Sequence, residues 1–287
     1  MKPEPQPGLD FPIIDAHTHT EFSGQPEPGS HIPYTLEEYL RALKEANVLG
    51  AVAHTSPSGG GYLDLKDRHV IHCVGIQAKV DVNRLEASLK SRRYGCIKIY
   101  LGYEHQYADS PHYEPAYRLA RRFHVPVVFH TGDTYSIKAK LKYADPMRID
   151  DVAVDHPDIT FVIAHCGNPW IETAAELAYK NPNVYLDGSA FLVGSLDRFS
   201  PEEAEQLVVT PLRWIFRYVN DPSKLMFGSD WPLVNIKAYA DIFKKAIPPQ
   251  YWRQVFYDNA VRVFQIPGLA RKESGKGVAP GHYVPAD

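Results

Sequence analysis

Short apolar runs alternate with amphipathic stretches along most of the chain. Residues 35–48 carry apolar side chains at the spacing of a helix face, and Ser200 followed by Pro201 is a helix-start signal. Further helical stretches are residues 114–124, 170–181 and 201–219. Apolar runs of strand length lie at residues 12–18, 49–56, 69–78, 95–102, 125–132, 159–167, 183–190 and 224–232. The pattern therefore predicts strands that alternate with helices.

This alternation favours an α/β fold with a parallel sheet, because parallel strands need crossover connections. A set of eight strand–helix units in 287 residues favours a single-domain (β/α)8 TIM barrel. A doubly wound open sheet is the alternative, but no G-x-G-x-x-G motif opens a helix after the first strand. We expect the barrel at residues 12–266, an N-terminal arm at residues 1–11 and a C-terminal tail at residues 267–287.

The first strand ends in polar residues at alternate positions. The segment FPIIDAHTHTEFSG places Asp15, His17 and His19 on one face of a strand. Two imidazoles on one face can bind a single ion where the strand twists or ends. Hydrogen-bonded histidines without a ligand are an equally good interpretation of this segment alone.

Lys98 and His130 occupy inward positions of two further strands. Alternation groups Ile97 with Ile99 on the face that should meet the helices, which leaves Lys98 facing the barrel interior. Phe129 likewise points outward and its neighbour His130 inward.

His165 and Asp230 follow the sixth and eighth strands. Alternation groups His165 with Phe161 and Ile163, and Asp230 with Met226, and we expect both groups to face inward. Because barrel active sites lie at the C-terminal ends of the strands, all these polar residues should meet at one rim.

The composition, with 44% hydrophobic and 23% charged residues, is that of an ordinary globular protein. A net charge of −3 provides no overall basic field for nucleic acid, and no apolar run reaches the ~20 residues of a membrane span. The cysteines Cys73, Cys96 and Cys166 contain no C-x-x-C pair. We therefore expect no disulfide framework, in keeping with a reducing compartment and a cytoplasmic location.

Imidazoles and a carboxylate at one rim match metal chemistry. They suit Zn²⁺, or another divalent first-row ion such as Mn²⁺. Such an ion lowers the pKa of a bound water and polarises a carbonyl group, which permits hydrolysis near neutral pH. We assign Asp230 to accept the proton of the attacking water and His165 to pass a proton to the leaving group.

Four motifs, DAHTH, VVFHTG, VIAHCG and FGSDWP, occur in an order that resembles the amidohydrolase superfamily. The resemblance is closest to its amidohydrolase-related branch, the metal-dependent TIM-barrel hydrolases and decarboxylases similar to aminocarboxymuconate-semialdehyde decarboxylase. It extends from about residue 12 to about residue 266, where YDNAVRVF resembles the closing helix of the group.

The resemblance implies a catalytic divalent metal bound by His17, His19, His130 and Asp230. It further implies that His165 is a catalytic or second-metal histidine. In binuclear members of the superfamily the position of Lys98 holds a carboxylated bridging lysine. The decarboxylase-like branch commonly uses one ion, so one ion is favoured over two, and Lys98 is equally a candidate to bind a substrate carboxylate.

Weaker candidates for substrate contact lie on or near loops that follow strands, since such loops carry specificity. They are Tyr100, Arg148, Asp187 and Trp231. Arg148 would serve equally well as a helix cap, and Trp231 as packing in the wall. His54 faces the same rim, and we expect a structural role for it.

The sequence thus predicts a metal-dependent hydrolase that attacks a lactone, amide or ester with metal-activated water. The first alternative is non-oxidative decarboxylation of a small aromatic or unsaturated carboxylic acid, and the second is a non-catalytic metal- or ligand-binding barrel. The net charge argues against a nuclease. The expected partner is a small-molecule substrate, with neither nucleic acid nor membrane, and a homo-oligomer is left open.

Overall fold

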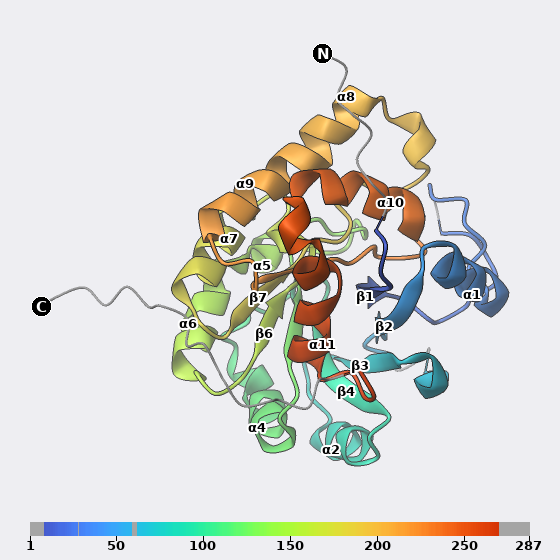
Figure 1. Ribbon diagram of the computed structural model, residues 1–287. Coiled ribbons are helices and arrows are strands. Elements are labelled where there is room, and N and C mark those ends of the chain that lie inside the picture. Colours follow the sequence, from blue (N-terminus) through green and yellow to red (C-terminus); the bar gives the residue numbers. More distant parts are fainter. Residues whose placement is uncertain (1–8, 28, 59–61, 270–287) are drawn as a thin grey trace, which may run out of the picture.

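An eight-stranded parallel barrel forms the centre of the computed structural model, which describes residues 9–27, 29–58 and 62–269 (Figure 1). The strands are neighbours in chain order, and Thr18 pairs with Trp231 where the first and last strands meet. The predicted single-domain TIM barrel is therefore confirmed. The strands are β1 (Ile13–Thr18), β2 (Val48–His54), β3 (Val70–Ile76), β4 (Tyr94–Tyr100), β5 (Val127–His130), β6 (Phe161–Ile163), β7 (Val184–Asp187) and β8 (Leu225–Met226).

Helices surround the barrel and connect most of its strands. Ser200 and Glu203 bind each other's backbone N–H groups at the start of α8, which confirms the predicted helix start. A π-helical turn at Glu205–Val209 joins α8 to α9, so the helix predicted at residues 201–219 is continuous. The helices are α1 (Leu36–Glu45), α2 (Val82–Lys90), α3 (Leu101–Glu104), α4 (Glu114–Phe123), α5 (Leu141–Ala144), α6 (Ile149–Asp155), α7 (Ile171–Lys180), α8 (Pro201–Ala204), α9 (Thr210–Val219), α10 (Ile236–Phe243) and α11 (Asn259–Phe264).

The barrel interior is an apolar core that the last helix closes. Ile14 and Val128 of the barrel share this core with Val261 and Phe264 of α11. Figure 1 shows α11 lying across the middle of the barrel. Because Ile14 is near the start of β1, α11 closes the N-terminal end of the barrel and leaves the C-terminal ends of the strands open for a site.

The alternation of side chains is confirmed in β4 and β5 but not at the end of β6. Ile99 and Phe129 pack in the outer core between strands and helices, and Lys98 points inward. The prediction that Phe161 and Ile163 face inward with His165 was wrong, since both pack in the outer core. His165 has a left-handed backbone, with a φ of 59°, so the chain turns there and strand alternation no longer sets the direction of its side chain.

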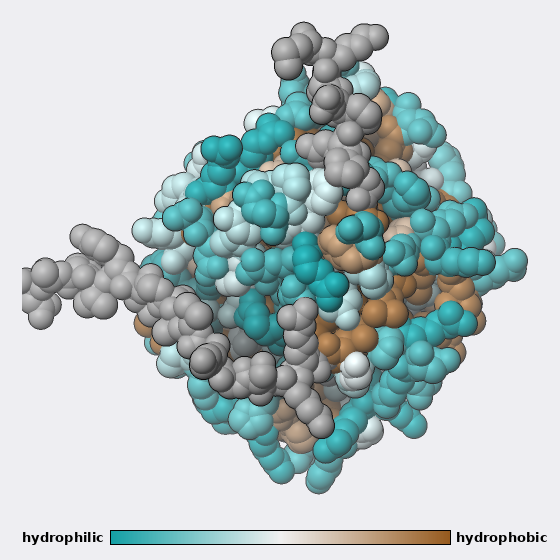
Figure 2. Space-filling view, viewed as in Figure 1, coloured by the Kyte–Doolittle hydropathy of each residue, from teal (hydrophilic) through white to brown (hydrophobic). Residues whose placement is uncertain are grey.

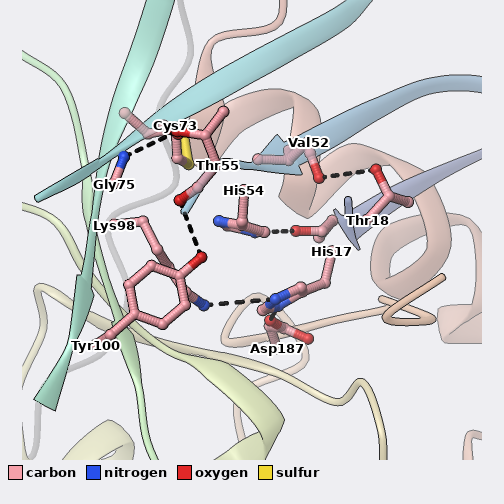
Figure 3. Close-up of a disulfide and its surroundings, with 12 residues drawn as sticks. His17, Thr18, Val52, His54, Thr55, Cys73, Gly75, Lys98, Tyr100 and Asp187 are labelled. Carbon is pink, nitrogen blue, oxygen red and sulfur yellow. Dashed lines mark hydrogen bonds and ion pairs between the residues drawn. A yellow bond between two sulfur atoms is a disulfide. The ribbon is translucent and has the colours of Figure 1, made fainter. Parts of the chain in front are cut away.

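Cys73 of β3 and Cys96 of β4 form a disulfide (Figure 3). The expectation of no disulfide was therefore wrong. The two residues are 23 positions apart in sequence but are direct partners in the parallel β3–β4 pair. Cysteine usage thus gives no support for a reducing compartment, and a cytoplasmic location stays a prediction.

Hydrophilic side chains cover most of the face that carries α11, with a hydrophobic area beside this helix (Figure 2). Within the described ranges, no helix is both long and apolar enough to cross a membrane. The predicted N-terminal arm and C-terminal tail lie largely outside the described residues, and the exact domain boundaries stay a prediction.

Candidate active site and metal centre

A cavity of about 480 Å³ opens where the strands end. The loops that follow several different strands form its wall, as expected for the active end of a barrel. The predicted site residues that line this cavity are His19, Tyr100, His130, His165 and Asp230.

His17 lies in the wall beneath the cavity and is held at both ring nitrogens (Figure 3). Its Nδ1 atom lies 2.5 Å from Oδ2 of Asp187. Its Nε2 atom lies 3.4 Å from Nζ of Lys98 and 3.6 Å from Oδ1 of Asp230. The carboxylate of Asp187 therefore fixes the ring so that Nε2 points to the centre of the site.

His19 is oriented in the same way by a backbone group. Its Nδ1 atom bonds the carbonyl oxygen of His54 at 2.9 Å, and its Nε2 atom lies 3.0 Å from Oδ1 of Asp230. One donor atom from each of His17, His19 and Asp230 lies within 4.8 Å of the other two. Two imidazoles and a carboxylate so arranged fit a divalent first-row ion, and their outer nitrogens already have partners.

His130 and His165 form a second pair beside this group. Nδ1 of His130 lies 3.3 Å from Nε2 of His165, and the ring centroids of His17 and His165 are 4.7 Å apart. Nε2 of His130 bonds the carbonyl oxygen of Asp133 at 3.0 Å, while Nδ1 of His165 lies 2.9 Å from the Ser189 hydroxyl oxygen. His130 is thus next to the three-residue group but is not a member of it.

Asp230 stays ionised although it is buried. Burial by itself would raise the pKa of its carboxyl, but the hydrogen bond with His19 and the electrostatic effect of His165 lower this pKa well below its usual range. Burial lowers the pKa of His165 to about 4, so this ring is neutral at pH 7. Burial likewise lowers the pKa of His17 and of His130. At His19 the effect of burial is outweighed by the hydrogen bond with Asp230, which raises the pKa of this ring. The site therefore offers an anionic carboxylate and neutral imidazoles at His17, His130 and His165, the forms that bind metal.

Asp15, the first polar residue of DAHTH, does not line the cavity. Its side chain connects β1 to the loop after β8 through hydrogen bonds. Its carboxylate accepts hydrogen bonds from the backbone N–H and the hydroxyl of Ser229, at 2.9 and 2.6 Å. Burial raises the pKa of Asp15 to about 7. Asp15 thus positions the segment that carries Asp230.

Lys98 is fully buried below the cavity, and in the described part of the chain no carboxylate forms an ion pair with it. Burial lowers the pKa of its amine. Lys98 is not among the lining residues of the cavity and lies next to His17, one of the three residues that could hold a metal ion.

Three of the four weaker candidates lie outside the cavity lining. Arg148 is exposed and forms ion pairs with Asp109 and Asp151. Trp231 is fully buried against Tyr39 and other aromatic rings, so it is packing in the wall. Asp187 binds His17 instead of a substrate. Tyr100 alone of the four lines the cavity.

Glu21 and Ser189 are among the residues of the site that the sequence analysis missed. Glu21 lines the cavity, and its Oε1 and Oε2 atoms accept hydrogen bonds from the Ser56 backbone and the Tyr34 hydroxyl. The alternation from Asp15 to His19 continues to Glu21 and could have indicated it. Ser189, the partner of His165, has no comparable signal.

The eight-stranded barrel and the histidines and aspartate at its C-terminal rim define a TIM-barrel protein with a candidate metal site, which is the arrangement that the resemblance to the amidohydrolase superfamily implied. In particular, the chain belongs to the amidohydrolase family, whose sequence pattern matches residues 14–266. No curated protein sequence matches the chain.

Solved structures similar to the chain share its fold at low sequence identity. An uncharacterised TIM-barrel protein from Bordetella bronchiseptica has a TM-score of 0.68 and 19% identity, over 90% of this chain and all of that one (100%). A probable 2-pyrone-4,6-dicarboxylic acid hydrolase from Acinetobacter baumannii has a TM-score of 0.61 and 17% identity, over 88% of this chain and 99% of that one. A 2,6-dihydroxybenzoate decarboxylase from Rhizobium has a TM-score of 0.63 and 12% identity, over 90% of this chain and 100% of that one.

Proposed function

We propose that the protein is a metal-dependent hydrolase of a small carbonyl substrate, namely a lactone, an amide or an ester. The observation that carries this proposal is the group of His17, His19 and Asp230, whose donor atoms converge within 4.8 Å beside the cavity. Asp187 and the carbonyl of His54 hold the outer ring nitrogens, as metal-binding histidines require.

The proposed ligands are these three residues and His130 from the adjacent pair. A divalent ion, with Zn²⁺ as first choice, would supply Lewis acidity that makes water reactive near neutral pH and polarises a carbonyl. We favour one ion. A second ion would need Lys98 as a bridging carbamate. Burial lowers the pKa of Lys98 to about 8, which increases the fraction of neutral amine that carbamate formation requires.

Asp230 and His165 are the proposed proton-transfer residues. Both line the cavity, and the ionised Asp230 can accept a proton from water. The proton that Asp230 accepts passes to the neutral ring of His165, which Ser189 orients. His165 then delivers this proton to the leaving group, so both side chains return to their starting state.

Decarboxylation is the rival reaction, since a solved structure that shares the fold carries that activity in its name. A decarboxylase has to bind the carboxylate of its substrate. Among the described residues, the cavity lining holds four carboxylates, from Glu21, Glu27, Asp133 and Asp230, and no lysine or arginine. This balance of charge favours hydrolysis.

The test is an activity screen of the protein loaded with Zn²⁺ or Mn²⁺. Lactones, esters and amides are assayed for opened or cleaved product, and small aromatic acids for released CO₂. Cleavage that a chelator abolishes and added metal restores supports the proposal. CO₂ release without any hydrolysis would favour the decarboxylase, and metal binding with neither product would favour the non-catalytic barrel.

A further inference from the structure

The cavity has a charge pattern that the metal centre does not explain. Among the described residues that line it, the charged side chains other than histidine are all acidic. Lys98 is buried behind the ligands and does not enter the cavity.

Two of the four carboxylates already have partners. Asp230 belongs to the metal centre, and both oxygens of Glu21 accept hydrogen bonds. Glu27 and Asp133 differ, because within the described part of the chain neither side chain forms a hydrogen bond or an ion pair. The cavity therefore carries two carboxylates with which no described side chain forms an ion pair.

Four tyrosines line the cavity together with these two carboxylates, namely Tyr34, Tyr100, Tyr103 and Tyr135. Burial, and then the charge of Glu27, raise the pKa of Tyr135. The Tyr103 hydroxyl accepts a hydrogen bond from the backbone N–H of Tyr135, which ties the loop after β5 to the wall. The faces of tyrosine rings attract cations, most strongly where water is excluded.

Apolar side chains also line the cavity, among them Pro57, Val193 and Leu233. An anionic substrate would meet negative charge at Glu27 and Asp133. A cationic group would find carboxylates and aromatic faces together, with apolar walls for its carbon skeleton.

From this arrangement we infer that the substrate carries a cationic nitrogen group away from its scissile carbonyl, bound by Glu27 and Asp133 among the cavity tyrosines. The inference rests on the proposed function, because it assigns the substrate class of that same site. A cationic substrate would distinguish this protein from the structurally similar hydrolase whose name specifies a dicarboxylic acid.

The experiment compares three small probes on the metal-loaded protein by isothermal titration calorimetry. They are choline, its neutral analogue dimethylbutanol, in which carbon replaces nitrogen, and the anion dimethylbutanoate. The same titrations are repeated on protein without metal. They show whether dimethylbutanoate binds through its carboxylate to the metal ion itself. We expect choline to bind about tenfold more tightly than dimethylbutanol, as a charge-assisted and cation–π contact together would give.

The variant Glu27→Gln/Asp133→Asn should remove most of this preference. The matched control is Glu37→Gln/Asp155→Asn, which changes the net charge equally at two exposed positions outside the cavity lining. Equal binding of choline and dimethylbutanol, or a preference that survives in the cavity variant, would overturn the inference. A protein that hydrolyses lactones but prefers anions keeps the proposed function and refutes the inference. Choline selectivity that depends on Glu27 and Asp133, in a protein that hydrolyses nothing, would support the cation site and refute the proposed function.

Discussion

The Nδ1 atom of His17 and the Oδ2 atom of Asp187 lie 2.5 Å apart, although the residues are 170 positions apart in sequence. This contact between β1 and β7 sets which nitrogen of His17 faces Lys98 and Asp230. A carboxylate behind a histidine fixes the tautomer and raises the basicity of the other nitrogen, so Asp187 should contribute to metal affinity without touching the ion.

Asp187→Asn should lower the metal affinity about 10- to 100-fold, because an amide orients the His17 ring less strongly than a carboxylate. Competition with a chromophoric chelator measures the affinity. Asp155→Asn, a change at an exposed position, is the control. An unchanged affinity in Asp187→Asn would show that this contact is not needed to position the ligand.

His17→Ala, His130→Ala and Asp230→Asn should each abolish hydrolysis, since each removes a proposed ligand. Circular dichroism should show that the fold is retained. His112→Ala, at an exposed position outside the cavity, should keep full activity. Full activity in all three ligand variants would refute the metal site.

His165→Asn should lower kcat by about 100- to 10,000-fold, the usual contribution of a general acid or base, while metal content stays near one equivalent. Elemental analysis of the natural protein, of His165→Asn and of Lys98→Ala gives the number of metal ions per chain. About one equivalent that is insensitive to Lys98→Ala means a single ion. About two equivalents that fall in both variants would mean a bridged pair instead.

His72 should make stability depend on pH. Its ring is buried against Tyr62 and 3.3 Å from the Thr20 hydroxyl, and burial lowers its pKa from 6.5 to about 4. Between these values the unfolded chain binds a proton that the folded protein does not, so stability is lost as the pH falls through 6.5. The loss between pH 7 and pH 5 should be about 2 kcal/mol.

Urea unfolding at both pH values, on the natural protein and His72→Gln, measures this contribution. The substitution should reduce the pH dependence of the free energy of unfolding by about that amount. Equal pH dependence in the two proteins would show that the His72 ring is not kept neutral by burial.

The disulfide between Cys73 and Cys96 should stabilise the barrel. The double variant Cys73→Ala/Cys96→Ala should lower the free energy of unfolding by about 3 kcal/mol, mainly through greater freedom of the unfolded chain. Alkylation of the unfolded, unreduced protein should label Cys166 only, as mass spectrometry would detect. Labelling of all three cysteines would show that the disulfide does not form.

The fold could be predicted from the sequence because its signals are local. Each strand and each helix has its own hydrophobic period, and alternation placed Lys98 inside and Ile99 outside β4 correctly. The same rule failed at His165, where the left-handed backbone turns the chain out of the strand. Alternation holds only while the strand continues, and active-site residues stand where strands end.

The sequence by itself determined the barrel, the family and the set of histidines and carboxylates that reach one rim, because these depend on local patterns and on the order of the motifs. Only the tertiary structure decided their partners. Three contacts join residues that are far apart in the chain. They are the hydrogen bond between His17 and Asp187, the disulfide, and the packing of Trp231 against Tyr39. Such contacts depend on strand register and on how loops return to the rim, which no short segment encodes.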